Sequence, residues 1–313
     1  MAVVYLRSDD HSERFGARAM GIKFDNQRVN TSGVSDRRGR GGPVAIGGGA
    51  GVVGLIIYVL ISVVGGGNVD PSQLIPPGGP VQGEGAGTGD LETRCNTDGA
   101  IQKYDDCFLV KVYNEINEVW TDEFERSGTT YEQPGLTFFT QGVQTGCGTA
   151  SSQVGPFYCP PDQGIFIDIG FLEQLQQQFG AEGRYAQAYI MAHESGHHLQ
   201  TLFGTERKVR AAQQQDPSQQ NDLSIALELQ ADCYAGVWSK LADEKGNVSV
   251  GEAELDQAIE AAEAVGDDRI QQKTQGRVDP ESWTHGSAEQ RKKWFLTGRQ
   301  SGDVNSCDTF AAS

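Results

Sequence analysis

Apolar residues recur at helical spacing in several segments of the chain, and this pattern predicts a mostly helical protein. The clearest repeat runs through residues 184–204 and stops at Gly204, a residue type that commonly follows the last turn of a helix. Two short apolar runs, 136–140 and 165–168, lie among Gly and Pro and predict strands. Further helices are predicted over residues 101–127, 171–179, 223–241, 251–265 and 287–298, and a Gln-rich loop over 211–220. The expected fold class is therefore α+β, mostly helical, with a small sheet.

One apolar segment differs from the others because it carries no charge. Residues 44–65 form a run of 22 uncharged residues, and about 20 such residues cross a bilayer core as a helix. Arg37, Arg38 and Arg40 precede the run, and bases remain on the cytoplasmic side. The pattern predicts a single-pass protein of the cell membrane with a cytoplasmic N-terminus and an extracytoplasmic C-terminal part. A cleaved signal peptide and a buried core helix are the alternatives.

Composition divides the chain into four predicted parts. Residues 1–43 would be a cytoplasmic segment, in which Met20 is a second candidate start, and residues 44–65 the transmembrane helix. Residues 66–94 are rich in Gly and Pro, as expected of a flexible linker. Residues 95–313 would then be the folded domain.

Charge and cysteines both set the C-terminal part of the chain apart. The net charge is −17, yet residues 1–43 hold eight Lys or Arg against five Asp or Glu. In the remainder of the chain Asp and Glu outnumber Lys and Arg, whereas nucleic-acid phosphates attract basic residues, so nucleic-acid binding is not expected. All six cysteines lie beyond residue 65, which is typical of disulfides in an oxidising compartment, with their pairing left open. They are Cys95, Cys107, Cys147, Cys159, Cys233 and Cys307.

Three of the five histidines cluster on the predicted helix 184–204. His193, Glu194 and His197 form the pattern H-E-x-x-H. Positions i and i+4 share one face of a helix, so the two imidazole rings can bind one metal ion, with Glu194 beside them as a base for water. The plain alternative is a helix with surface histidines and an ion-paired glutamate.

A second motif, E-x-x-x-D, lies on the predicted helix 223–241. Glu228 can complete a zinc site of two histidines and one glutamate, which keeps one position open. Asp232 lies one turn further and can accept the free ring N–H of a histidine ligand, which fixes the orientation of that ring. The rest of the segment is mostly apolar, where carboxylates are costly to bury unless they face a cation. Two solvated acids on an outer stripe are the alternative.

Other polar residues near these motifs have less specific signals. His285 could stabilise the charge that develops on a substrate oxygen, as could Arg291 on the following helix, although a purely structural His285 is the alternative. His198 points away from the histidine pair and is expected to pack. Ser195 lacks the sequence context of a serine nucleophile, and Gly196 would let another backbone approach closely.

These segments resemble the bacterial family of neutral zinc metallopeptidases and, more distantly, the gluzincins. The resemblance begins near Met20 and rests on VNTSGVSDRRGRGG, CGTASSQVGPFYCPPDQGIFID, AHESGHHLQ, LELQADCYAGVW, THGSAEQRKKWFLTG and CDTF. It implies a zincin-like domain with an active-site helix, a glutamate helix and a small sheet, whose edge strand, for which 165–168 is the candidate, binds extended substrate. The downstream motif departs from related membrane metalloproteases, which have Pro where this chain has Gly286, directly after His285.

The resemblance implies that His193, His197 and Glu228 bind Zn²⁺ and that Glu194 is the general base. The expected function is a membrane-anchored zinc endopeptidase with a protein or peptide substrate, in which Glu194 and His285 act in catalysis. A catalytically silent zinc-binding module of the cell envelope and a cell-wall peptide amidase are the alternatives. The sequence leaves the oligomeric state open.

Overall fold

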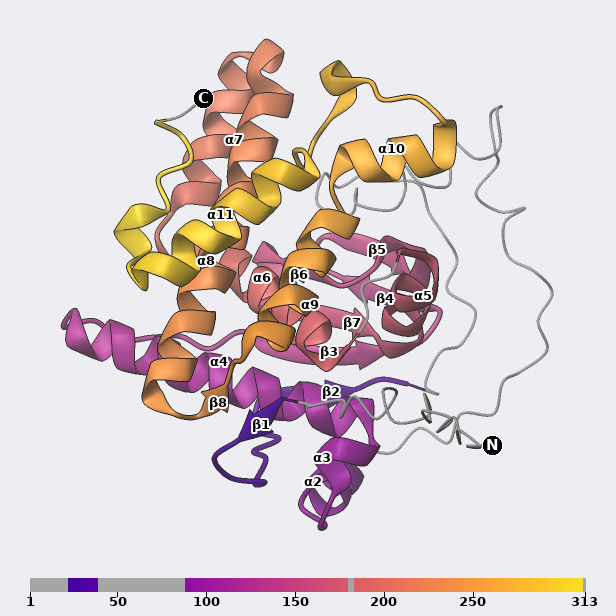
Figure 1. The fold of residues 1–313 in the computed structure, drawn as a ribbon, viewed down its shortest axis with the longest axis vertical. Coiled ribbons are helices and arrows are strands. Elements are labelled where there is room, and N and C mark those ends of the chain that lie inside the picture. Colours follow the sequence, from indigo (N-terminus) through magenta and orange to yellow (C-terminus); the bar gives the residue numbers. More distant parts are fainter. Residues whose placement is uncertain (1–21, 39–87, 180–182, 312–313) are drawn as a thin grey trace, which may run out of the picture.

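Figure 1 presents a computed structural model of the chain, which describes residues 22–38, 88–179 and 183–311. Its helices are α2 (Thr88–Cys95), α3 (Ala100–Lys103), α4 (Asp105–Arg126), α5 (Ile169–Phe179), α6 (Arg184–Leu202), α7 (Thr205–Gln215), α8 (Gln220–Lys245), α9 (Glu252–Ala264), α10 (Asp267–Gln275) and α11 (Ala288–Ser301). Its strands are β1 (Lys23–Phe24), β2 (Val34–Asp36), β3 (Gly135–Phe139), β4 (Gly142–Thr145), β5 (Gly148–Ser151), β6 (Phe157–Cys159), β7 (Gly164–Asp168) and β8 (Val248–Ser249). Helices predominate and the sheets are small, which confirms the predicted α+β class.

Helix α6 lies at the centre of the molecule (Figure 1). It contacts strands β6 and β7 of the largest sheet as well as helices α4, α8 and α9. Burial on several faces explains its composition, because Ala188, Met191 and Leu199 are all fully enclosed. The histidine motif is therefore carried by a helix that other elements enclose on several sides.

Helices α8 and α11 pack with their backbones almost in contact. A Cβ atom at Gly298 of α11 would lie 1.9 Å from the carbonyl oxygen of Cys233, and one at Gly236 of α8 would lie 2.0 Å from that of Phe295. Only glycine permits this approach. The crossing holds the first turn of α11 beside the middle of α8, where the acidic motif lies.

The largest sheet has the strand order β2-β3-β7-β6. Strands β2, β3 and β7 are parallel, and β6 is antiparallel to β7. Residues 165–168 form a strand as predicted, but the expectation that this strand is an edge is wrong, because β3 and β6 pair with its two sides. The edge strand next to α6 is β6.

Several predicted helix boundaries also change. The segment 211–220 is wrongly predicted as a loop, because helix α7 covers residues 205–215 and α8 already begins at Gln220. Helix 101–127 is interrupted at Tyr104, where the backbone is extended. Helix α2 occupies residues 88–95 and buries Leu91 completely, so the folded domain begins before the predicted boundary at residue 95.

Residues 22–38, here called the N-terminal strap, belong to the same folded unit as residues 88–311. Strand β1 pairs with β8, and β2 extends the largest sheet beside β3. Val29 and Val34 are buried in the core, and the backbone N–H of Val29 donates to Asn96 Oδ1 at 3.0 Å. Arg38 forms ion pairs with both Asp36 and Asp106. The strap therefore does not form a separate N-terminal segment, in contrast to the predicted division at residue 43.

The strap places a condition on membrane topology. The predicted transmembrane helix, residues 44–65, lies outside the described residues, and no helix within the described ranges is both long and apolar enough to span a bilayer. A single crossing between residues 38 and 88 would put the strap and the remainder of the fold on opposite sides of the membrane. Strand pairing requires them on the same side.

A cysteine pair across β1 and β8 tests this arrangement. Lys23 and Ser249 are direct partners in the antiparallel register, where Cα atoms lie about 4.5–5.5 Å apart, within the range that a disulfide bridges. We expect the double variant Lys23→Cys/Ser249→Cys to crosslink in the full-length protein expressed in cells, as measured by a mobility shift on non-reducing gels. The two single variants are the controls. No crosslink above these controls would place the strap on the other side, as a single crossing predicts.

Three disulfides join the six cysteines, and each pairs neighbours along the chain. They are Cys95–Cys107, Cys147–Cys159 and Cys233–Cys307. The third ties helix α8 to the C-terminal segment, across 74 residues of sequence. The prediction that all six cysteines form disulfides is confirmed.

Candidate metal centre

Helix α6 presents His193 and His197 on one face, one helical turn apart. Their Nε2 atoms lie 3.2 Å from each other, and the two ring planes are nearly perpendicular. His193 is 3% exposed, whereas His197 is partly open to solvent. The predicted pairing of the two rings is therefore present.

Helix α8 brings the Glu228 carboxylate to the same point. Its Oε2 atom lies 3.2 Å from His193 Nε2, and its Oε1 atom lies 3.5 Å from His197 Nε2. Ligands bound tetrahedrally at the zinc distances of about 2.0–2.1 Å are roughly 3.3 Å apart. The buried Oε2 atom accepts no hydrogen bond. The spacing of the three side chains, their donor types and this unpaired oxygen fit a zinc ion with one open position.

The other ring nitrogen of each histidine is held by a neighbour. His193 Nδ1 lies 2.8 Å from Asp232 Oδ1, and His197 Nδ1 lies 2.9 Å from the side-chain oxygen of Gln200. Because both partners are acceptors, the Nδ1 atoms carry the protons and the Nε2 lone pairs point toward Glu228. Asp232 was predicted for this role, whereas Gln200 was missed; its position one turn after His197 was the available signal.

The electrostatics of the three side chains suit a cation. Burial lowers the pKa of His193, but Asp232 and Glu228 outweigh burial and raise it to about 10. Burial alone would raise the pKa of Glu228, yet His197, His193 and His285 bring it well below its usual range. Burial also lowers the pKa of His197. The negative charges of Asp232 and Glu228 thus favour a positive charge between the rings, which a divalent ion bound by the Nε2 and carboxylate atoms would supply.

Glu194 follows His193 on α6 and is 4% exposed. Burial raises the pKa of its carboxyl group to about 8, while the charge of His193 and the backbone of Tyr158 on strand β6 act in the opposite direction. A nearby metal ion would bring this raised pKa down toward neutrality. A carboxyl group that exchanges a proton near neutral pH has the property that a general base needs.

Arg291 supports the centre from helix α11. Its Nε atom donates to Asp232 Oδ2 at 2.8 Å, and its Nη2 atom donates to Oδ1 at 2.9 Å. Tyr189 donates its hydroxyl hydrogen to the same Oδ1 atom. Arg291 is 1% exposed and Asp232 is fully buried. The structure thus gives Arg291 a supporting role that the sequence analysis did not predict: its guanidinium holds Asp232, which in turn orients His193.

Removal of Arg291 is expected to destabilise the fold strongly. The variant Arg291→Met leaves the buried Asp232 carboxylate without a counter-ion, which costs about 3–5 kcal/mol in the free energy of unfolding. The double variant Arg291→Met/Asp232→Asn removes that isolated charge and should recover part of the loss. Urea unfolding of metal-free protein, followed by tryptophan fluorescence, measures both.

Arg126→Met is the matched control, because Arg126 forms an exposed ion pair with Glu123. Exposed pairs contribute about 0–1 kcal/mol. A loss for Arg291→Met no larger than for this control would contradict a structural role for the Arg291–Asp232 pair.

His285 lies at the edge of the centre, in the loop before α11. Its Nδ1 atom lies 3.2 Å from Asp267 Oδ1, and Asp267 Oδ2 accepts the backbone N–H groups of Thr284, His285 and Gly286. His285 is close enough to Glu228 to lower the pKa of that carboxylate. The structure thus brings the predicted His285 near the ligands, and Asp267, which the sequence reasoning missed, fixes its loop.

The remaining residues of the motif have structural roles. Ser195 donates its hydroxyl hydrogen to the Met191 carbonyl oxygen at 2.9 Å, as expected of a non-catalytic serine. His198 is fully buried and lies 3.0 Å from the Tyr158 hydroxyl through its Nδ1 atom. A Cβ atom at Gly196 would lie 2.9 Å from the backbone of Ala231, so the predicted close approach is between α6 and α8. This approach lets Glu228 reach the two histidines.

Comparison with known proteins identifies related sequences. The family model described as "Putative neutral zinc metallopeptidase" matches residues 20–310. The "Uncharacterized protein YpfJ" of Escherichia coli (strain K12) is 40% identical over 295 residues, which are 91% of this chain and 98% of the relative. The "Uncharacterized protein Rv2575" of Mycobacterium tuberculosis (strain ATCC 25618 / H37Rv) is 43% identical over 230 residues, 71% of this chain and 76% of the relative. No solved structure matches the chain.

The extent of the family match agrees with the fold. It begins at residue 20, so it includes the N-terminal strap, and it ends at residue 310, beyond the last disulfide. It also contains His193, His197 and Glu228, whose geometry fits a zinc ion. The chain therefore belongs to the neutral zinc metallopeptidase family, which makes zinc its cofactor.

Proposed function

We propose that this protein is a zinc-dependent endopeptidase that cleaves peptide bonds at the centre formed by α6 and α8. The observation that carries the proposal is the triangle of His193 Nε2, His197 Nε2 and the Glu228 carboxylate, with sides of 3.2, 3.2 and 3.5 Å, next to Glu194. A centre that only joined two helices would have no use for a buried carboxylate beside the ligands. The arrangement of a histidine helix, a glutamate helix and a small sheet supports the zincin-like fold that the sequence resemblance implies.

Glu194 would move the proton that the reaction requires. When bound, zinc polarises the carbonyl group of the scissile peptide bond and makes a water molecule acidic enough to attack near neutral pH. Glu194 accepts the proton of the attacking water and delivers it to the nitrogen of the leaving amine. Its burial and its raised pKa support this exchange.

His285 would assist at the carbonyl oxygen. Negative charge develops on this oxygen during the attack, and a preorganised N–H donor stabilises it. Asp267 orients the His285 ring through Nδ1 and holds the loop through three backbone N–H groups. The Nε2 side of the ring would then face the reaction centre.

Strand β6 would bind the substrate backbone. It is an edge strand of the largest sheet, it contacts α6, and the backbone of its residue Tyr158 interacts with Glu194. An extended peptide added beside β6 would form backbone hydrogen bonds along its free edge. We therefore assign the proposed substrate-binding role to β6 rather than to residues 165–168.

We also propose that the folded unit works outside the cytoplasm, anchored to the cell membrane by residues 44–65. The three disulfides support an oxidising compartment. Because the strap pairs with β8 and β3, residues 22–38 would lie in that compartment as well. The anchoring segment would then not make the single crossing that the flanking arginines predict.

The proposed activity is tested with the full-length protein and a mixed peptide library. We expect cleavage at internal peptide bonds, loss of cleavage after chelation, and recovery when one equivalent of zinc is added, with products identified by mass spectrometry. Bound zinc without cleavage of any library peptide would contradict the proposal and favour a catalytically silent module. Cleavage that persists in the chelated protein would contradict zinc-dependent chemistry.

A further inference from the structure

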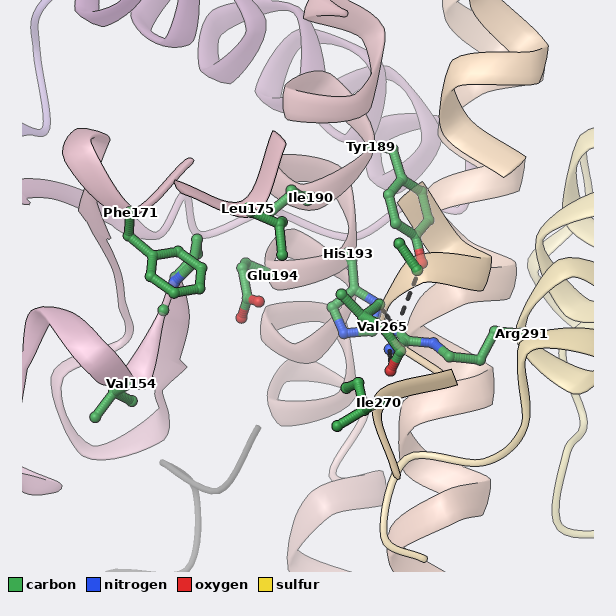
Figure 2. A pocket seen from close by; sticks show the side chains of 13 residues that line it. Val154, Phe171, Leu175, Tyr189, Ile190, His193, Glu194, Val265, Ile270 and Arg291 are labelled. Carbon is green, nitrogen blue, oxygen red and sulfur yellow. Dashed lines mark hydrogen bonds between the residues drawn. The ribbon is translucent and has the colours of Figure 1, made fainter. Parts of the chain in front are cut away.

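An apolar cavity opens directly beside Glu194 (Figure 2). Helix α6 supplies one wall with Ile190, His193 and Glu194, and α5 supplies Phe171 and Leu175. The segments before β6 and after α9 complete it; their apolar side chains are Val154, Val265 and Ile270. Figure 2 shows the Glu194 carboxylate between Phe171 and Val154 on one side and Val265 and Ile270 on the other.

Two of the polar side chains that line this cavity, Arg291 and Tyr189, already have partners. Arg291 is the single Lys or Arg among the described residues that line it, and its charge is paired with Asp232. A third nitrogen, Nη1, donates to the Val265 carbonyl oxygen at 3.3 Å. The Tyr189 hydroxyl donates to Asp232. The cavity therefore offers no unpaired Lys or Arg to a substrate carboxylate, and most of its lining is apolar.

The position of the cavity relates it to the scissile bond. His193 and Glu194 line it, whereas His197 and Glu228 do not, so it lies on the Glu194 side of the metal centre. A peptide whose carbonyl group is attacked at that centre has the side chains of two residues next to the bond. A side chain directed toward Glu194 would meet the cavity.

We propose that this cavity is the specificity pocket of the enzyme and that it accepts an aliphatic or aromatic side chain from a residue that flanks the scissile bond. The inference rests on the proposed peptidase function and adds its substrate class: peptides with an apolar residue on one fixed side of the cleaved bond. The cavity measures about 50 Å³, space for roughly four water-sized groups. A leucine or isoleucine side chain has this size.

Cleavage-site mapping tests the pocket in the active enzyme. In the full-length, zinc-loaded protein, we expect every efficiently cleaved bond of the library to carry an apolar residue, Leu or Ile foremost, on the same side. In a matched peptide pair, replacement of that Leu by Asp should lower kcat/KM roughly 10- to 100-fold or more. Cleavage with equal efficiency for Leu and Asp at both flanking positions would overturn the pocket assignment while leaving the peptidase function intact.

Two variants reshape the pocket in opposite directions. Ala264→Phe, at the end of α9, should fill it and shift the preferred residue from Leu toward Ala. Ile270→Ala should enlarge it and shift the preference toward Phe. Ala253→Phe is the matched control, since Ala253 is exposed at the start of the same helix, and it should leave the preference unchanged. Unaltered preferences in both pocket variants, with their folding verified by circular dichroism, would overturn the assignment.

A binding measurement separates the pocket from the chemistry. In the Glu194→Gln variant, calorimetry should show that a Leu-containing substrate peptide binds at least tenfold more tightly than its Asp-containing counterpart. This difference in affinity is expected even if turnover is absent. A failure of the peptidase proposal therefore does not by itself disprove the pocket assignment. Equal affinities for the two peptides would contradict the pocket itself.

Discussion

Replacement of Glu194 by Gln is expected to lower kcat by about 10²–10⁴-fold while one zinc ion remains bound per chain. Gln keeps the size of the side chain but cannot accept the proton of the attacking water. The zinc-binding atoms belong to His193, His197 and Glu228, whose mutual distances do not depend on Glu194. Zinc content is measured by elemental analysis, and kcat with the best library peptide.

The neighbouring variant Ser195→Ala is the control for this measurement. The Ser195 hydroxyl bonds to the Met191 carbonyl oxygen within the helix, so its removal should change kcat by less than about threefold, a small effect compared with loss of a general base. Activity of Glu194→Gln equal to that of the unaltered protein would contradict the assigned role. Loss of zinc in this variant would show that Glu194 binds the metal instead.

Replacement of Glu228 by Gln is expected to weaken zinc binding by more than 100-fold. The variant loses the negative charge that the two histidines face at 3.2 and 3.5 Å, and a neutral amide is a poor zinc ligand. Competition with a fluorescent chelator measures the affinity. Because kcat requires the metal, cleavage should fall in parallel at limiting zinc.

Gln200→Ala is the graded control, since Gln200 contacts His197 rather than the metal. Loss of such a supporting partner costs about 10- to 100-fold in metal affinity. We therefore expect zinc affinity to be lowest in Glu228→Gln, intermediate in Gln200→Ala and highest in the unaltered protein. Zinc affinity of Glu228→Gln equal to that of the unaltered protein would remove Glu228 from the ligand set.

The ligands could be predicted from sequence because they rest on local periodicity. His193 and His197 need only a continuous helix to share a face, and α6 is continuous from Arg184 to Leu202. Glu228 and Asp232 are likewise one turn apart on a single helix. The resemblance to a zinc family then predicts that the motifs of the two helices form one site. The spacing of the motifs along the sequence does not predict this on its own.

The supporting residues could not be predicted, because they depend on contacts between distant segments. Asp267 orients His285 from 18 residues earlier in the sequence, and Arg291 reaches Asp232 from another helix. Strands β1 and β2 have two and three residues, too few for an alternating pattern, and their partners lie far along the chain. Helix α7 was missed since it buries only Val209 among polar residues that are good helix formers.

The location of the zinc ion tests the central claim most directly. Crystals of the full-length protein, soaked with zinc and measured at the zinc absorption edge, should show one strong anomalous peak. We expect this peak about 2.0–2.2 Å from His193 Nε2, His197 Nε2 and a carboxylate oxygen of Glu228. A peak at another site, or one that contacts both histidines but lies beyond bonding distance of Glu228, would contradict the proposed centre.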